Sequence, residues 1–212
     1  MIAAVVPVKA VDESKSRLRA DFDADDVRQL STAMLRDVLD ALAAVPAIAR
    51  VVVATPDAAV ARIARSSGAE ALVRDDPGLN AAIENATARL AAEGADAVLV
   101  MLGDVAGARP EEIAQLIASL DGDGVALAPS RDGGSSALLR VPHDAVAAGF
   151  GPESAKVHRE RALAAGLRFE ECSLSSLAID VDRREDLERL IASDAPATHT
   201  RAAWRAIAER TP

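Results

Sequence analysis

Aspartates follow two apolar segments of the chain at the points where a strand would end. Asp104 comes two residues after the most apolar segment, 96–102, and Asp180 and Asp182 close the last short one. Side chains two residues apart on a strand share a face, so Asp180 and Asp182 can point to one ion. Oxygen ligands beside a phosphate substrate favour magnesium over zinc, so these aspartates are candidate ligands of Mg²⁺. The alternatives are an ordinary loop residue for Asp104 and a helix N-cap for Asp182, with Glu185 three residues on.

Four cations accompany the first apolar segment, residues 2–9, and the loop after it: Lys9, Lys15, Arg17 and Arg19. The segment is too short for a globular helix and rich in Val, which predicts a buried strand. Sheets of α/β proteins bind ligands at the carboxyl ends of such strands. The sequence has no GxxxxGK[ST] motif and no GxGxxG after this strand, so the cationic loop itself is the expected cradle for a triphosphate. The alternative is a solvated loop whose charges bind nothing.

Three further segments combine tight turns with polar side chains. Asn80 follows a Pro-Gly turn at the start of a helix, where it either caps the helix or hydrogen-bonds a base or ribose. The loops 132–137 and 150–154 carry hydroxyls and suit close approach to a phosphate, although they also suit ordinary turns. A charged run after the second loop is typical of a solvated helix face: Lys156, His158, Arg159 and Arg161.

Strands and helices alternate along most of the chain. The predicted strands are 2–9, 49–55, 69–73, 96–102, 124–130, 136–142, 167–172 and 177–182. Helices are predicted between most of them, the first beginning after a cap at Asp23 or Asp25. This alternation predicts the α/β class, with a mostly parallel sheet covered by helices on both faces. The segment 136–142 breaks the alternation, which predicts a mixed sheet there.

The composition fits a cytoplasmic protein with one main domain. The chain has 212 residues and a formal net charge of −9, which argues against nucleic-acid binding. Cys172 is the only cysteine, so no internal disulfide forms, as suits a reducing compartment. No run reaches the roughly 18 apolar residues of a membrane span. We expect a domain at 1–192 and a C-terminal tail with a short helix at 193–212.

Several sequence blocks, in their order and spacing, resemble the 2-phospho-L-lactate guanylyltransferase family. They are VPVKAVDESKSRL at 6–18, GLNAAI at 78–83, the Asp104 loop, DGGSSALL at 132–139, FGPESAKVH at 150–158 and DVDRREDL at 180–187. The resemblance covers about residues 2–191. It implies a single-domain nucleotidyltransferase fold, related to the glycosyltransferase-A type, that uses GTP and Mg²⁺.

The resemblance also implies a reaction and the residues that serve it. The family transfers GMP from GTP to 2-phospho-L-lactate, phosphoenolpyruvate or 3-phosphoglycerate and releases pyrophosphate, in the biosynthesis of the deazaflavin coenzyme F(420). The implied nucleotide-binding residues are Lys9, Lys15, Arg17 and Asn80. The implied catalytic residues are Lys15, Asp104 and Asp182, of which Asp104 and Asp182 would hold the metal. The implied ligands of the phospho-acid are Ser135, Ser136, Gly151 and Ser154. GTP and one phospho-acid are the expected partners, and a homodimer is a candidate assembly.

The chain departs from the family pattern at three places. GDVAG at 103–107 stands where the family has an ADLPL-like segment, Ser135-Ser136 replaces Thr-Asn, and Glu153 replaces the glycine of FGPGS. A site with fewer amide donors should discriminate less sharply between small phospho-acids. Two alternatives stay open: another nucleotidyltransferase of the same architecture, such as a molybdenum-cofactor type, and a nucleotide-binding protein without catalysis.

Overall fold

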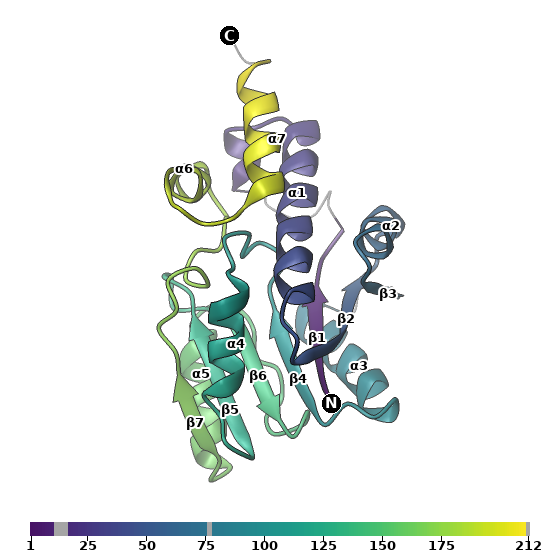
Figure 1. Cartoon of the computed structure of the whole chain (residues 1–212), viewed down its shortest axis with the longest axis vertical. Coiled ribbons are helices and arrows are strands. Elements are labelled where there is room, and N and C mark those ends of the chain that lie inside the picture. The colour runs from purple at the N-terminus through teal and green to yellow at the C-terminus, as the bar shows by residue number, and fades with distance from the viewer. Residues whose placement is uncertain (11–16, 76–77, 211–212) are drawn as a thin grey trace.

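The computed structural model describes residues 1–10, 17–75 and 78–210. Within these ranges the chain forms one seven-stranded sheet in the order β3-β2-β1-β4-β6-β5-β7 (Figure 1). The strands are β1 Ile2–Pro7, β2 Ile48–Thr55, β3 Glu70–Val73, β4 Ala97–Met101, β5 Gly124–Pro129, β6 Ser135–Val141 and β7 Arg168–Glu171.

The sheet is mixed and mostly parallel, which confirms the predicted fold class. β6 runs antiparallel to both of its neighbours, β4 and β5, and the other neighbouring pairs are parallel. β5 and β6 are joined by the short turn 130–134, which is long enough to reverse the chain but too short for a parallel crossover.

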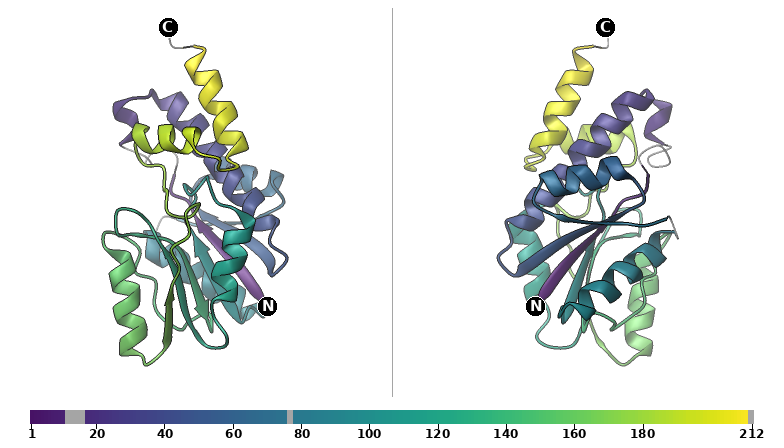
Figure 2. Two further views of the ribbon diagram at one scale, coloured as in Figure 1. Left: turned by 60° about the vertical axis from the view of Figure 1, so that its left-hand side comes forward. Right: turned by 90° about the vertical axis from the view of Figure 1, so that its right-hand side faces the viewer.

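Helices cover both faces of the sheet (Figure 2). They are α1 Ala24–Ala43, α2 Ala58–Ser66, α3 Leu79–Ala92, α4 Pro110–Ala118, α5 Ser154–Ala164, α6 Arg184–Ala192 and α7 Thr198–Ala208, with a 3₁₀ turn, η2, at Leu18–Ala20. The expected cap of α1 is present, because the Asp23 side chain accepts a hydrogen bond from the Asp26 N–H. None of the helices in the described ranges has the length and apolar character of a membrane span.

The first strand is apolar throughout because both of its faces are buried. Ala4 and Val6 pack with α1, α2 and α4 in one core layer, while Ala3 and Val5 pack with α3 and α5 in the other. All four side chains are 0% exposed. Burial on both faces is what distinguishes a central strand of a parallel sheet from the alternating pattern of a half-exposed one.

A third apolar cluster lies beyond the sheet and joins the C-terminal helices to α1 (Figure 1). Leu18 of η2 and Leu30 of α1 pack there with residues of α6 and α7. Asp37 of α1 accepts hydrogen bonds from the backbone N–H groups of His199 and Thr200, both at 2.8 Å. The first turn of α7 is therefore held by a carboxylate of α1, which satisfies two of its free N–H groups.

The predicted strand 177–182 is wrong. This segment makes single backbone hydrogen bonds to two different loops, from Arg131 N–H to the Ala178 carbonyl and from Val181 N–H to the Asp104 carbonyl, both at 3.2 Å. Because neither contact continues into a ladder, the segment stays irregular and bridges the two loops instead of extending the sheet.

Candidate active site

The ends of β1 and β4 adjoin at the point where the strand order of the sheet reverses. The chain runs outward from β1 to β2 and β3, and then returns to the other side of β1 as β4. Ligands of open α/β sheets bind at such a switch point. Gly103 packs here against β1, and a Cβ built on it would lie 3.2 Å from Cγ2 of Val8. The close packing places Asp104 next to the carboxyl end of β1.

Four carboxylates surround this point: Asp104, Asp132, Asp180 and Asp182. Burial, together with the negative charges of the other three carboxylates, raises the pKa of Asp180 to about 6. The Val181 N–H group donates to the Asp104 carbonyl, which ties the two aspartate segments together. Asp180, the other member of the predicted aspartate pair, lies among these charges, and Asp132 is a carboxylate that the sequence interpretation missed.

These carboxylates suit Mg²⁺ that is bound partly by substrate phosphates, rather than a metal ion enclosed by protein ligands alone. Among the described residues, no three His, Cys, Asp or Glu side chains converge closely enough to enclose a metal ion. Mg²⁺ is usually bound by one or two carboxylates together with waters and substrate phosphates. The uncompensated negative charge reflected in the raised pKa of Asp180 is what a divalent cation would neutralise. Asp104 and Asp182 stay the predicted ligands.

Asp182 is not the cap of α6. The N-cap residue is Arg183, and the Asp186 carboxylate accepts hydrogen bonds from the Arg183 N–H at 3.0 Å and the Asp182 N–H at 3.4 Å. Asp186 therefore takes the role that the sequence pattern assigned to Asp182 and Glu185. The Asp182 carboxylate faces the guanidinium of Arg17, with Nη1 3.6 Å from Oδ2.

The cationic loop is described in part. Lys15 lies outside the described residues, and Lys9 and Arg17 lie exposed on either side of that gap. Arg17 lines a hollow together with Arg131, Asp180 and Arg183. The hollow therefore places cations beside the carboxylates, as a site for metal-bound phosphates requires.

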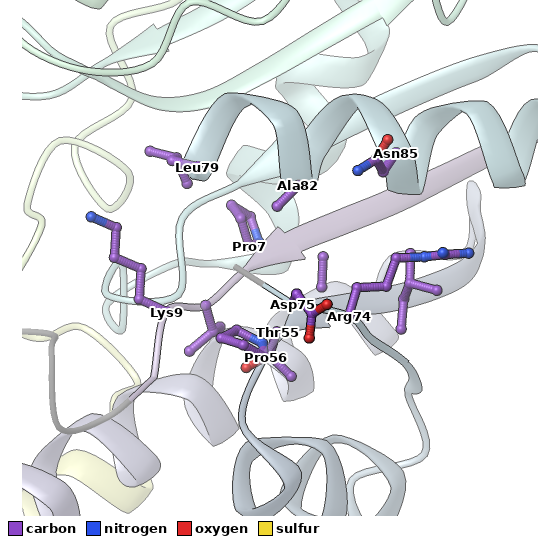
Figure 3. A pocket seen from close by; sticks show the side chains of 12 residues that line it. Pro7, Lys9, Thr55, Pro56, Arg74, Asp75, Leu79, Ala82 and Asn85 are labelled. Carbon is purple, nitrogen blue, oxygen red and sulfur yellow. The ribbon is translucent and has the colours of Figure 1, made fainter. Parts of the chain in front are cut away.

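A second pocket opens between α3 and the ends of the first three strands (Figure 3). Its lining includes Lys9 and several residues that the sequence interpretation missed: Thr55, Pro56, Arg74, Asp75 and Asn85. Most of these directly follow or close a predicted parallel strand, which was the available signal. The pocket contains Val8, which also touches Gly103, so it adjoins the aspartate cluster. Its apolar walls and few polar groups suit a nucleoside.

Asn80 does not cap α3, because Gly78 occupies the N-cap position. Its side-chain amide instead donates to the Phe150 carbonyl at 3.0 Å and accepts from the Phe150 N–H at 2.8 Å. Leu79 and Ala82, close to Asn80 on α3, line the pocket of Figure 3. A direct contact between Asn80 and the nucleotide stays a prediction, while the tie to Phe150 is a feature of the fold.

The two small-residue loops meet, as their common assignment to the phospho-acid requires. The Ala155 N–H group donates to the Gly133 carbonyl at 3.3 Å. Gly151 is exposed with φ of 142°, and Glu153 is exposed with φ of 53°, so the added carboxylate lies at the surface. The loops lie at the amino end of α5, where the positive end of the helix dipole favours an anion.

The three serines of the predicted acid site lie deeper than expected. Ser135 is 2% exposed and Ser154 is 1% exposed, and their hydroxyl oxygens are 3.1 Å apart. Ser136 is 0% exposed, and its hydroxyl has no hydrogen-bond partner among the described residues. The assignment of all three to the acid stays a prediction.

The charged run of α5 is a solvated face except for one residue. Lys156, Arg159 and Arg161 are exposed, but His158 is 0% exposed. The available signal was the spacing of Ser154, His158 and Ala162, four residues apart on one helical face.

The segment 103–107, where the chain departs from the family pattern, is a tightly packed loop. A Cβ on Gly107 would lie 2.9 Å from the Leu190 side chain and 3.3 Å from that of Ala195. Val105 and Ala106 are buried as well, so α6 and the segment after it hold the loop that carries Asp104.

Comparison with known proteins identifies the family of the chain. The family model described as guanylyl transferase CofC-like matches residues 2–208, so the family extends through α7 and not only to 191 as expected. A phosphoenolpyruvate guanylyltransferase of Rubrobacter xylanophilus is 40% identical over 195 residues, covering 91% of this chain and 94% of the relative. A 3-phospho-D-glycerate guanylyltransferase of Phenylobacterium zucineum is 38% identical over 191 residues, covering 88% of each chain.

Solved structures share the fold. A putative nucleotide-diphospho-sugar transferase from Desulfovibrio desulfuricans G20 superposes with a TM-score of 0.78 at 18% identity, covering 97% of this chain and 94% of that one. The CMP:2-keto-3-deoxy-manno-octonic acid synthetase complexed with CTP gives 0.62 at 15% identity, covering 89% and 96%. The predicted nucleotidyltransferase is thereby confirmed, and the chain belongs to the guanylyl transferase CofC-like family.

Proposed function

We propose that the protein transfers GMP from GTP to the phosphate of a small phospho-acid, in the cytoplasm, for the biosynthesis of coenzyme F(420). Relatives that carry the names of phosphoenolpyruvate and 3-phospho-D-glycerate guanylyltransferases support this substrate class. Phosphoenolpyruvate is the first acid to test, because the relative with 40% identity carries that name, as do several others.

The observation that carries the proposal is a series of neighbouring residues that leads from the pocket beside α3 to the amino end of α5. Val8 of the nucleoside pocket touches Gly103, which precedes Asp104. The negative charges of Asp104 and Asp132 both raise the pKa of Asp180. Asp132 in turn accepts from the Gly134 N–H at 3.0 Å, in the loop that meets the start of α5. A nucleotide in the pocket and an acid at α5 would therefore meet at the aspartates.

The chemistry follows from the charges at that meeting point. An oxygen of the acid's phosphate forms a bond to the α-phosphorus of GTP, and the bond from that phosphorus to the bridging oxygen breaks. The electron pair leaves with pyrophosphate. A general base is unnecessary, because a phosphate oxygen is already anionic at neutral pH. Mg²⁺, when bound, would neutralise charge on the phosphates.

The residues of this chain would bind and orient the two anions. Asp104 and Asp182 would hold the metal, and Lys9, Lys15 and Arg17 would contact the triphosphate. Arg17 is already turned toward the aspartates, since it lies 3.6 Å from Asp182. Cations fixed beside the reacting phosphates stabilise charge that develops on the leaving pyrophosphate.

The test is mass spectrometry of the products from GTP and Mg²⁺ with phosphoenolpyruvate, 3-phosphoglycerate and 2-phospho-L-lactate in separate reactions. We expect a guanylylated acid and one pyrophosphate per product. CTP and UTP serve as controls for the base, because a nucleotidyltransferase of another specificity on the same architecture would prefer one of them. Nucleotide binding without pyrophosphate release would identify a binding protein instead. Sedimentation of the purified protein tests the predicted homodimer.

A further inference from the structure

His158 is buried on the inner face of α5, behind the two loops assigned to the phospho-acid. It is 0% exposed, and its ring lies edge-on to Phe150 with the ring centroids 5.0 Å apart. The chemistry proposed above does not use it. A buried imidazole with hydrogen bonds at both nitrogens is a polar group inside an apolar layer. Buried polar networks of this kind fix the orientation of their members.

The hydrogen bonds of His158 determine its tautomer. The Gly149 N–H group donates to Nε2 at 2.9 Å, so Nε2 carries no proton. The neutral ring then has its proton on Nδ1, which lies 3.0 Å from Oγ of Ser135. Burial and the nearby charges of Arg161 and Arg140 lower the pKa of His158 to about 4, so the ring is neutral at pH 7.

One hydroxyl proton beside His158 is not used in the hydrogen bonds of this arrangement. His158, Ser135 and Ser154 form a row joined by two hydrogen bonds, 3.0 and 3.1 Å long. The row carries three protons: Nδ1–H and two hydroxyl protons. Two of them fill the two hydrogen bonds, so one O–H proton must point out of the row. Among the described residues, neither hydroxyl has a further acceptor.

The row ends at the place where the two loops meet. Ser154 is the first residue of α5, and a Cβ on Gly134 would lie 3.8 Å from its Oγ. Ser154 Oγ donates to Ser135 Oγ at 3.1 Å, so the leftover proton is that of Ser135, beside the first residue of α5. The positive end of the α5 dipole favours an anion there. A phosphate oxygen arriving there would accept a hydrogen bond from this hydroxyl, and charge-assisted hydrogen bonds of this kind are the strong ones.

We propose that His158 is a positioning residue of the phospho-acid site, which directs the hydroxyls of Ser135 and Ser154 so that one of them donates to the acid's phosphate. This inference rests on the proposed function for the identity of the anion. With Nδ1–H directed at Ser135, the Ser135 oxygen is always an acceptor toward the ring, and its own proton is turned away from it. A ring without that proton would let Ser135 turn inward and take the donor away from the ligand.

Two substitutions of His158 separate this role from packing. In His158→Asn the amide nitrogen is attached to Cγ, as Nδ1 is, and can still donate to Ser135. In His158→Gln the amide is one bond further out, in the place of Nε2, so it can meet Gly149 but not donate to Ser135. Both variants lose the ring and its contact with Phe150. His143→Gln, at the opposite end of the sheet beside Asp96, is the matched control.

The experiment is calorimetric titration of the full chain with phosphoenolpyruvate and Mg²⁺, and separately with GTP. 3-Phosphoglycerate and 2-phospho-L-lactate serve as second and third acids. We expect His158→Gln, Ser135→Ala and Ser154→Ala each to weaken acid binding by about 10-fold or more, the usual effect of losing a hydrogen bond to a charged group. His158→Asn should stay within about 3-fold of wild type. GTP affinity should be unchanged in all of them.

A double substitution provides the second measurement. If His158 acts through Ser135, adding His158→Gln to Ser135→Ala should weaken acid binding little further. Equal loss of acid and GTP affinity in both His158 variants, or an undiminished effect of His158→Gln on top of Ser135→Ala, would overturn the inference. Binding needs no turnover, so failure of the GMP-transfer assay with these binding effects intact would count against the proposed reaction alone. Absence of acid binding by the wild type would overturn the inference.

Discussion

The side-chain amide of Asn80 and the backbone of Phe150 form a reciprocal pair of hydrogen bonds across 70 residues of sequence. One partner lies on α3, beside the nucleoside pocket, and the other lies in the loop that leads to α5. Both hydrogen-bonding groups of the amide are engaged. Asn80 therefore links the two regions that the proposed reaction brings together.

We expect Asn80→Ala to weaken acid binding more than GTP binding. The substitution leaves the N–H and C=O groups of Phe150 without their partner, which typically costs about 1–3 kcal/mol of stability. Thermal unfolding and separate titrations with the two substrates measure these effects. Asn85→Ala, on the wall of the nucleoside pocket, is the matched control and should affect GTP alone. A selective loss of GTP affinity in Asn80→Ala would restore its assignment as a nucleotide contact.

Asp104→Asn should lower turnover by about 10²-fold or more, as expected for removing a preorganised electrostatic group. The fold should stay intact, because the change removes one charge from a cluster whose members repel Asp180. The pKa of Asp180 should fall for the same reason. Steady-state rates over a magnesium series, with circular dichroism of the same samples, measure both. Near wild-type turnover at low magnesium would remove Asp104 from the metal site.

Arg17→Ala should weaken GTP binding by roughly 1.5–3 kcal/mol, the range for a hydrogen bond to a charged group. The same expectation holds for Lys15→Ala. Affinity for GTP should also fall as salt rises, because the Arg17 side chain is solvent-accessible. Arg65→Ala is the control, because it removes a cation from the last turn of α2. Unchanged GTP affinity in both loop variants would return this segment to an ordinary solvated loop.

Ser136→Ala distinguishes a substrate ligand from a buried core residue. The hydroxyl of Ser136 is buried without a partner among the described residues, so its removal should leave the free energy of unfolding unchanged or raised. If Ser136 contacts the acid, the same variant loses acid affinity. The larger change Ser136→Asn, expected from the sequence to narrow the choice of acid, should instead overpack the site at a cost of about 1–3 kcal/mol. Activity of the wild type on more than one acid stays our expectation.

The buried His158 and the half-buried Asp180 give opposing pH dependences of stability. The pKa of His158 is about 4 in the folded chain, against an ordinary value of 6.5 for a solvated histidine, so between these values the unfolded chain holds more protons. Its contribution, about 3 kcal/mol in full, is lost as the pH falls through this window. The pKa of Asp180 is raised from 3.8 to about 6, so its contribution is lost as the pH rises from 3.8 to 6.

Urea unfolding between pH 4 and 7 without magnesium separates the two groups. We expect a shallow dependence in the wild type, since the two contributions cancel in part. Asp180→Asn should make stability rise more steeply with pH, and His158→Asn should shift the slope in the opposite direction. Parallel curves for wild type and both variants would contradict the assigned pKa shifts.

Much of the fold and part of the site follow from the sequence because their signals are local. The apolar segments of β1 and β4 are readable as buried strands, and a strand end predicts where Asp104 must lie. The aspartates at 180 and 182 are adjacent to each other by spacing alone. Turn residues identify the loops 132–137 and 150–154 without knowledge of where they pack.

Tertiary structure alone decided which of these local features meet. The partners of Ser135 and Asn80 lie 23 and 70 residues away, and nothing in the spacing of either residue indicates them. The N-cap of α6 is Arg183 rather than Asp182, and the carboxylate that accepts from the N-cap N–H group is that of Asp186 rather than Glu185. Hydrogen bonds of buried side chains depend on which strands become neighbours, and that order is set by burial of the whole sheet rather than by any short stretch of chain.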